Sequence, residues 1–235
     1  MKEWKEFGSA DQDKQATWSG NLTDRATYPW EVSLMNKRLL GLAVAGSMLL
    51  GLATSATAGV PDLTQSTASG PGSTLQVLIT PAGLGSNLGT AGATVTVTVR
   101  DANGTPIQGF PFQDVTLNDN GTDELNICPG GSVADANTDA SGVTTFTGNI
   151  FGGGFTQNGL QVFLGGNALA GPALSIDVNS ADITGDRVVN IADVGEFGVD
   201  FGSGAFAFRS DFIDDGELNI ADVGEFALHN QEVCP

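Results

Sequence analysis

The chain has very little positive charge beyond its first 58 residues. Six of the nine Lys and Arg lie in residues 1–58, and the other three are Arg100, Arg187 and Arg209. Because six acidic residues also lie in 1–58, residues 59–235 carry 21 acidic side chains and the whole formal net charge of −18. Phosphate backbones and anionic membrane surfaces both need clustered Lys and Arg. The sequence therefore argues against both as partners and favours cations.

Aromatic side chains typical of sugar-binding clefts are also missing. Trp and Tyr do not occur after Trp30, and His229 is the single histidine. A sugar hydrolase needs two carboxylates flanking a cleft, and its sugar rings usually rest on aromatic platforms. No Ser-His-Asp set, Cys-His set or nucleotide loop is evident, and His229 suits a helix C-terminus better than general-base work. We expect a protein that is not an enzyme.

Residues 35–58 look like a targeting segment. Met35 is followed by Lys37 and Arg38, then by an apolar run over 39–53 and by the small residues 56–58. This order predicts a signal peptide over 35–58, cleaved after Ala58, and hence a secreted or cell-surface protein. A membrane anchor is the alternative, but the run is short and broken by glycines. Residues 1–34 are read as disordered, or as an over-extended N-terminus upstream of a true start at Met35.

Only two cysteines are present, Cys128 and Cys234. In an oxidising compartment they could pair and tie the C-terminal tail to the preceding domain. Closing a loop of this length would contribute roughly 4–5 kcal/mol in the chain-entropy treatment. Two free thiols are the alternative.

Residues 59–178 have the pattern of a β domain. Residues 94–100 alternate Thr and Val with period two, and an Asn103-Gly104 turn follows. Glycine-rich 151–155 lacks the Lys-Ser/Thr pair of a phosphate loop, so we expect a flexible hairpin loop there. About seven short strands predict an antiparallel sandwich. The strand candidates are 75–80, 94–100, 112–117, 125–128, 143–148, 160–164 and 174–178.

This domain resembles bacterial immunoglobulin-like domains of the invasin and intimin type. The resemblance rests on 95–107, read as strand-turn-strand, and on 137–146, where a Thr-Asp-x-x-Gly turn leads into a strand. It implies a spacer or display module on the cell surface. The expected fold class is thus an immunoglobulin-like β-sandwich followed by a small α-helical module at 179–235.

That second module contains an exact octapeptide repeat. Residues 190–197 recur unchanged at 219–226, and each copy follows alternating oxygen-bearing residues. A twelve-residue calcium loop uses positions 1, 3, 5, 7, 9 and 12, with a backbone carbonyl at position 7. The sequence therefore predicts up to two Ca²⁺ sites. The first set is Asp182, Thr184, Asp186, the Val188 carbonyl, Asn190 and Asp193; the second is Asp211, Asp215, the Glu217 carbonyl, Asn219 and Asp222.

Each loop departs from the pattern at one point. Arg187 occupies the sixth position of the first loop, where glycine normally allows a left-handed turn. Ile213 occupies the third position of the second loop and offers no ligand, so a water or Asp214 would have to substitute. We therefore expect the first site to bind calcium more tightly.

Apolar residues after each loop fall at helical spacing. Ile191, Val194 and Phe197 share one stripe, and their counterparts in the second repeat share another, which predicts two helices with these residues in the core. The eighth loop positions, Val189 and Leu218, are expected to pair the two loops through a small β-bridge.

The duplicated pattern resembles the type I dockerin module, which has two F-hand calcium loops, each followed by a helix. The matching segments are 182–193, with departures at Thr184 and Arg187, and 211–222, with departures at Ile213 and Asp214. The resemblance implies docking to a cohesin-like domain through loop positions 10 and 11. Those residues are Ile191, Ala192, Ile220 and Ala221, and their identity in both repeats would allow two docking orientations. The alternative partner is this chain's own immunoglobulin-like domain.

Three functions follow from these patterns. The first is a secreted, non-catalytic calcium-binding protein that uses a dockerin-like module for docking or assembly. The second is an accessory component of extracellular polysaccharide degradation, which dockerins usually serve. The third is a structural surface protein in which calcium only stabilises the fold.

Overall fold

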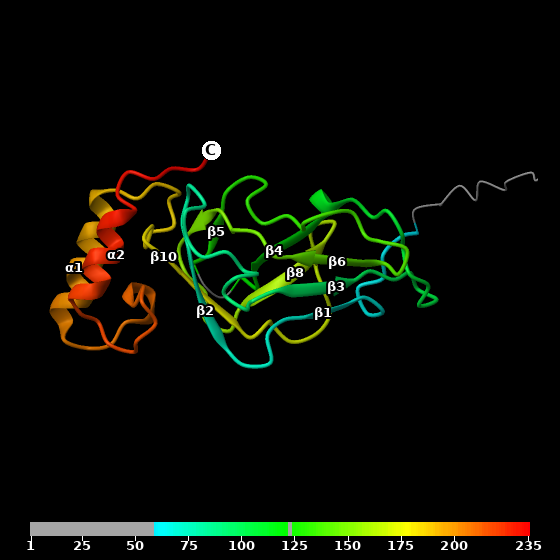
Figure 1. Ribbon diagram of the computed structural model, residues 1–235, viewed down its shortest axis with the longest axis horizontal. Coiled ribbons are helices and arrows are strands. Elements are labelled where there is room, and N and C mark those ends of the chain that lie inside the picture. The colour runs from blue at the N-terminus through cyan, green and yellow to red at the C-terminus, as the bar shows by residue number, and fades with distance from the viewer. Residues whose placement is uncertain (1–58, 122–123) are drawn as a thin grey trace, which may run out of the picture. The chain divides into compact units, whose positions relative to one another are not determined.

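The structure is a computed structural model and describes residues 59–121 and 124–235 (Figure 1). The expected signal peptide at 35–58 and the stretch 1–34 lie outside the described residues. The fold of the described residues is mostly β with two short helices, as expected. Its strands are β1 Thr67–Ser69, β2 Leu75–Ile79, β3 Val95–Thr98, β4 Val115–Asp119, β5 Asn126–Ile127, β6 Val143–Phe146, β7 Gly152–Gly153, β8 Leu160–Leu164, β9 Asn167–Ala168 and β10 Ile176–Ser180; its helices are α1 Ile191–Ser203 and α2 Ile220–Leu228, with 3-10 turns at Phe112–Asp114 and Phe208–Ser210.

The strands form four small sheets. Antiparallel pairing joins β1-β3-β6, β4-β8-β9 and β5-β7. Strands β2 and β10 pair in parallel, with Val77 opposite Val178, so the expectation of a wholly antiparallel sandwich was wrong. The two strands are nearly 100 residues apart, and a connection of that length can return the chain in the same direction, which a tight hairpin cannot.

The sequence alternation decides which side chains form the main core. Val95, Val97 and Val99 are completely buried, while the threonines between them are half-buried, because successive side chains of a strand point to opposite faces. The two expected turns are present. Asp101 accepts hydrogen bonds from the amides of residues 103 and 105, and Asp139 does the same for those of 141 and 143.

Two local expectations were wrong. Residues 112–114 form a 3-10 turn after Pro111, and the strand begins only at Val115. The Gly152-Gly153 pair, expected in a flexible loop, is strand β7, buried and paired with β5. Because glycine has no side chain, strand β7 can pack closely against the backbone of β5. A Cβ on Gly152 would come within 3.0 Å of the Asn126 carbonyl oxygen.

A second, smaller core lies in the C-terminal module. It contains the aromatic rings of Phe197 in α1, Phe212 and Phe226 in α2, with ring centroids 5.4–6.0 Å apart. These contacts place α1 and α2 side by side (Figure 1). Strand β10 runs through residue 179, the expected domain boundary, and ends at Ser180, two residues before Asp182 of the first loop. Neither helix in the described part of the chain is long and apolar enough to span a membrane.

Candidate functional site

The two repeated loops have the same backbone conformation. Position 4 is left-handed in both, with φ of 68° at Gly185 and 58° at Asp214. Position 6 is left-handed as well, with φ of 73° at Arg187 and 78° at Gly216. Arg187 thus has the left-handed backbone that glycine normally provides at this position, and its Cβ makes that conformation sterically unfavourable.

The carboxylate of the first aspartate in each loop accepts hydrogen bonds from backbone amides of the turn. Asp182 accepts hydrogen bonds from the amide of Asp186 (3.1 Å) and from that of Arg187 (2.7 Å). Asp211 accepts the equivalent bonds from the amides of Asp215 (3.4 Å) and of Gly216 (3.0 Å). Each carboxylate therefore lies inside its own loop.

The twelfth residue of each loop ties the loop to the helix that follows. Asp193 accepts from the amide of Asn190 at 2.8 Å and from the amide of Thr184 at 2.9 Å. Asn190 in turn accepts from the amide of Ala192 at 2.8 Å, which completes a capping box at the start of α1. Asp222 and Asn219 repeat this arrangement at the start of α2.

The fifth and ninth positions also make matching contacts. The side-chain amide of Asn190 donates to Asp186 at 3.3 Å and to the Val188 carbonyl at 3.0 Å. The side-chain amide of Asn219 donates to Asp215 at 2.9 Å. In both loops the side chain at position 5 accepts from the amide at position 7, which belongs to Val188 in the first loop and to Glu217 in the second.

The loops differ at the third position, as the sequence indicates. The Thr184 hydroxyl lies 2.9 Å from an oxygen of Asp193 and 3.4 Å from one of Asp182, so it adds an oxygen to the first loop. Ile213 supplies none, and its side chain is 43% exposed.

Four carboxylates of these loops are buried without a cationic partner. Asp182, Asp193, Asp211 and Asp222 are at most 1% exposed, whereas the ion pairs of the described residues use Arg209 and His229 with other acids. Burial is the main cause that raises the pKa of Asp182 and of Asp211, and neighbouring aspartates raise both further. Buried carboxylates are normally paired or bound to a metal.

The donor set suits a hard cation, although the side chains are turned toward backbone amides. Within residues 59–121 and 124–235, no three His, Cys, Asp or Glu side chains are gathered in a way that could hold a metal ion. The oxygens of Asp182, Thr184, Asp186, Asn190 and Asp193 nevertheless share one short loop through the contacts above. Oxygen-only ligands of this kind are typical of calcium.

The C-terminal tail pairs with the first loop and is covalently fixed. Cys128 and Cys234 form a disulfide with a Cα–Cα distance of 5.7 Å. The Val189 amide donates to the Glu232 carbonyl, and Val188 forms a β-bridge with Val233. The expected bridge between Val189 and Leu218 was therefore wrong, because the disulfide-held tail occupies the pairing edge of Val189.

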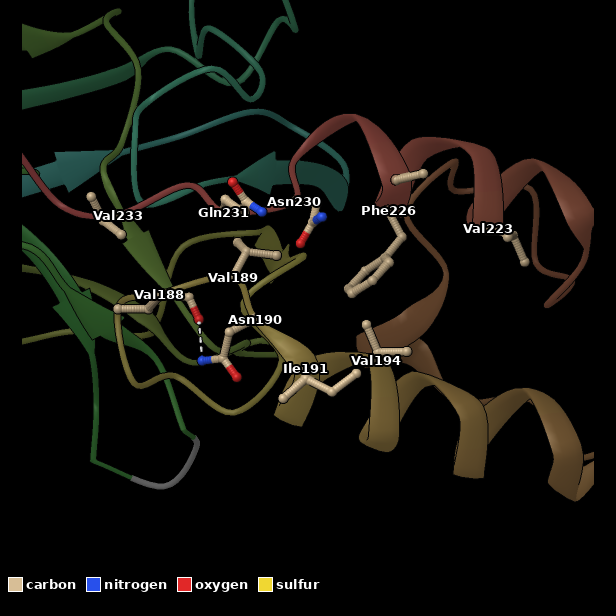
Figure 2. A pocket seen from close by; sticks show the side chains of 11 residues that line it. Val188, Val189, Asn190, Ile191, Val194, Val223, Phe226, Asn230, Gln231 and Val233 are labelled. Atoms are coloured by element: carbon tan, nitrogen blue, oxygen red, sulfur yellow. Dashed lines mark hydrogen bonds between the residues drawn. The ribbon is translucent and has the colours of Figure 1, made fainter.

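An apolar groove lies where the first loop, α1, α2 and the tail meet (Figure 2). Its volume is about 690 Å³. Phe226 points into the space between the helices, while Asn190, Asn230 and Gln231 add polar atoms (Figure 2). The other lining residues are Val188, Val189, Ile191, Val194, Val223, Ala227 and Val233.

The candidate docking residues are on the surface. Ile191 is 81% exposed and Ile220 77%, and Ala192 and Ala221 are exposed beside them. The expectation that Ile191 and Ile220 belong to the core was wrong, because each is the first residue of its helix. Among the apolar residues expected in the core of the two helices, only Phe197 and Phe226 are buried. Val194 is 42% exposed.

His229 is the C-cap of α2, as expected from its position. Its side chain is buried between two acids, with Nδ1 2.7 Å from Glu232 and Nε2 3.3 Å from Glu225. Both partners are within four residues in sequence, so this group stabilises the end of the helix.

Several residues that contact the first loop were not singled out by the sequence patterns. Asn126 donates to the Gly185 carbonyl and accepts from the Arg187 guanidinium, both at 2.7 Å. Gly153 lies directly against the Asp182 carboxylate. They belong to strands β5 and β7, far from the loop in sequence, so no local pattern connects them with it.

Comparison with known proteins adds little to this geometry. No family model and no curated protein matches the chain. Among solved structures, it is similar to one described as the crystal structure of the Lin-41 filamin domain, at 16% identity and a TM-score of 0.27. The alignment covers 50% of this chain and 95% of the filamin chain. A TM-score this low supports no inference about fold or function.

Proposed function

We propose that the chain is a secreted, non-catalytic calcium-binding protein, in which a dockerin-like docking module follows an immunoglobulin-like domain. The observation that carries the proposal is the burial of Asp182, Asp193, Asp211 and Asp222 in two loops of one conformation, where none of them takes part in the ion pairs of the described residues. A divalent cation would neutralise these carboxylates. It would thereby offset the cost of burying them.

Each loop would hold one ion. When bound, Ca²⁺ supplies charge neutralisation and a fixed loop geometry; no chemical reaction is assigned to it. The ligands proposed for the first ion are Asp182, Thr184, Asp186, the Val188 carbonyl, Asn190 and Asp193. Those proposed for the second are Asp211, Asp215, the Glu217 carbonyl, Asn219 and Asp222.

The docking surface would include the start of both helices. Ile191 and Ile220 are large apolar side chains that remain exposed, and Ile191 also lines the groove beside α2. Residues 182–235 contain 12 acidic and two basic side chains, so electrostatic complementarity favours a partner with an apolar contact surrounded by Lys or Arg. A cohesin-like domain is the partner that the dockerin resemblance implies.

The two docking orientations are not equivalent in their surroundings. On the first-loop side the groove is about 690 Å³ and includes the tail residues Gln231 and Val233. The corresponding hollow on the second-loop side is about 320 Å³ and lies beside Phe206 and Glu217. This asymmetry favours docking on the first-loop side.

Secretion is part of the same proposal. The targeting pattern before Gly59 and the Cys128–Cys234 disulfide both suit an oxidising, extracellular environment.

A pull-down from the organism's secreted proteins, with and without a calcium chelator, tests the docking role. We expect a calcium-dependent partner that is lost when Ile191 and Ile220 are both replaced by Asp. The matched control replaces Val199, which is 66% exposed on α1 and outside the groove. If calcium raises the melting temperature but no partner is retained, its role is structural only.

A further inference from the structure

The first loop makes more contacts with the β domain at its turn than the second loop does. Asn126 in strand β5 donates from Nδ2 to the carbonyl of Gly185, at loop position 4, and accepts at Oδ1 from the Arg187 guanidinium, at position 6. One side chain therefore holds both left-handed residues of the turn.

Strand β7 closes the loop from another side. The amide of Gly154 donates to the Asp182 carbonyl at 2.6 Å. A Cβ on Gly153 would lie 1.7 Å from an Asp182 carboxylate oxygen, so the strand backbone touches this carboxylate directly. Any residue other than glycine would displace it.

The disulfide completes the support. Cys128 follows strand β5, and Cys234 donates from its amide to the Arg187 carbonyl at 3.3 Å. The bond thus anchors the tail to the same strand region that carries Asn126, while the tail pairs with Val188 and Val189.

The second loop lacks the equivalent environment at its turn. A methyl group on Gly216, at position 6 of the second loop, would meet no atom within 4 Å, whereas the Arg187 guanidinium at position 6 of the first loop donates to Asn126 of strand β5 at 2.7 Å. Its contact with the strands is at position 1, where Gln76 and Asn179 donate to the Asp211 carbonyl.

We infer that Asn126 is a positioning residue for the first cation loop. By holding positions 4 and 6, it keeps the turn formed before an ion arrives, and it makes ion binding at this loop part of the stability of the β domain. The inference rests on the proposed calcium binding and adds a residue outside the repeat to it. It also gives the arginine at position 6 a function, since its guanidinium bond to Asn126 offsets the strain of the left-handed turn.

The test compares the two loops within the oxidised chain. Asp222→Ala leaves only the first loop with its full ligand set, and Asp193→Ala leaves only the second. Adding Asn126→Ala should weaken calcium binding about 10- to 100-fold in the Asp222→Ala background, the usual effect of losing a residue that orients metal ligands. In the Asp193→Ala background it should change affinity less than about twofold, within the range of independent sites.

Calorimetric titration with Ca²⁺ gives the readout, and Asn167→Ala is the matched control. Asn167 is an exposed strand residue whose amide bonds only the nearby Gly165 carbonyl at 3.2 Å. Should Asn126→Ala not fold, Asn126→Asp provides the second variant, because it keeps an acceptor for Arg187 and loses the donor to Gly185.

The outcomes separate the two proposals. Equal calcium affinity with and without the Asn126 substitution in the first-loop background would overturn this inference and leave calcium binding intact. An equal loss in both backgrounds would also overturn it, because the effect would then be general destabilisation. The absence of saturable binding in the parent chain would overturn the proposed function, and this inference with it.

Discussion

Replacing Gly153 by Ala tests whether the backbone of strand β7 packs directly against the Asp182 carboxylate of the first loop. The new Cβ would lie 1.7 Å from Oδ2 and 2.3 Å from Cγ of Asp182, whereas ordinary contacts begin near 3.4 Å. Asp182 cannot easily move, because it is fully buried and two backbone amides hold its carboxylate. Strand β7 must therefore shift and lose pairing with β5.

We expect Gly153→Ala to lower the free energy of unfolding by about 2–3 kcal/mol, within the range for overpacked cores. That loss corresponds to roughly 4–12 °C in melting temperature for a chain of this size. Thermal unfolding followed by circular dichroism, in chelator and in calcium, measures it. Calcium should also stabilise the variant less than it stabilises the parent, because the clash falls on a proposed ligand.

Gly148→Ala is the matched control. Its Cβ would meet only an Asp135 oxygen at 4.0 Å, and its backbone is not left-handed. We expect its stability to lie within about 0.5 kcal/mol of the parent. Equal melting temperatures for the two alanine variants would refute the direct contact between strand β7 and the Asp182 carboxylate.

Three further predictions concern other contacts. Arg209→Gln should destabilise the chain by about 1–2 kcal/mol, since Arg209 bonds Asp200 at 2.7 Å. Burial raises the pKa of Asp200, but the hydrogen bonds from Arg209 and Ser210 outweigh burial and lower that pKa overall. The difference in unfolding free energy between parent and variant, measured by urea unfolding, should therefore shrink as the pH falls below about 4. Replacing Cys128 and Cys234 together by Ser should cost at most about 4–5 kcal/mol by the chain-entropy treatment of a 106-residue separation, and an unchanged urea midpoint would contradict it. Gly195→Ala, in open space on α1, should raise stability by about 0.5–1 kcal/mol, and a lower melting temperature would show that the helix is constrained there.

Local sequence patterns predicted the elements whose causes are local. The Val95-Val97-Val99 alternation gave a buried strand face. The repeat predicted a helix after each loop, and α1 and α2 begin at the equivalent residues Ile191 and Ile220. In each case the residues that set the conformation are within a few positions of the element.

Features that depend on distant contacts were missed. The parallel pairing of β2 with β10, the Gly153 strand and the Val189–tail pairing all join segments far apart in sequence. Ile191 fitted the apolar period but proved exposed, because periodicity gives spacing and not which end of a helix is covered. Asn126 had no sequence signal, since an asparagine in a short strand acquires its role only from the loop packed against it.

The most direct test of the account is a calorimetric titration of the oxidised chain with Ca²⁺, together with the Asp193→Ala and Asp222→Ala variants. The account predicts two ions per chain, with the tighter site lost in Asp193→Ala and the weaker site lost in Asp222→Ala. If the parent chain shows no saturable heat at millimolar calcium, the buried carboxylates do not serve a cation and the account is wrong.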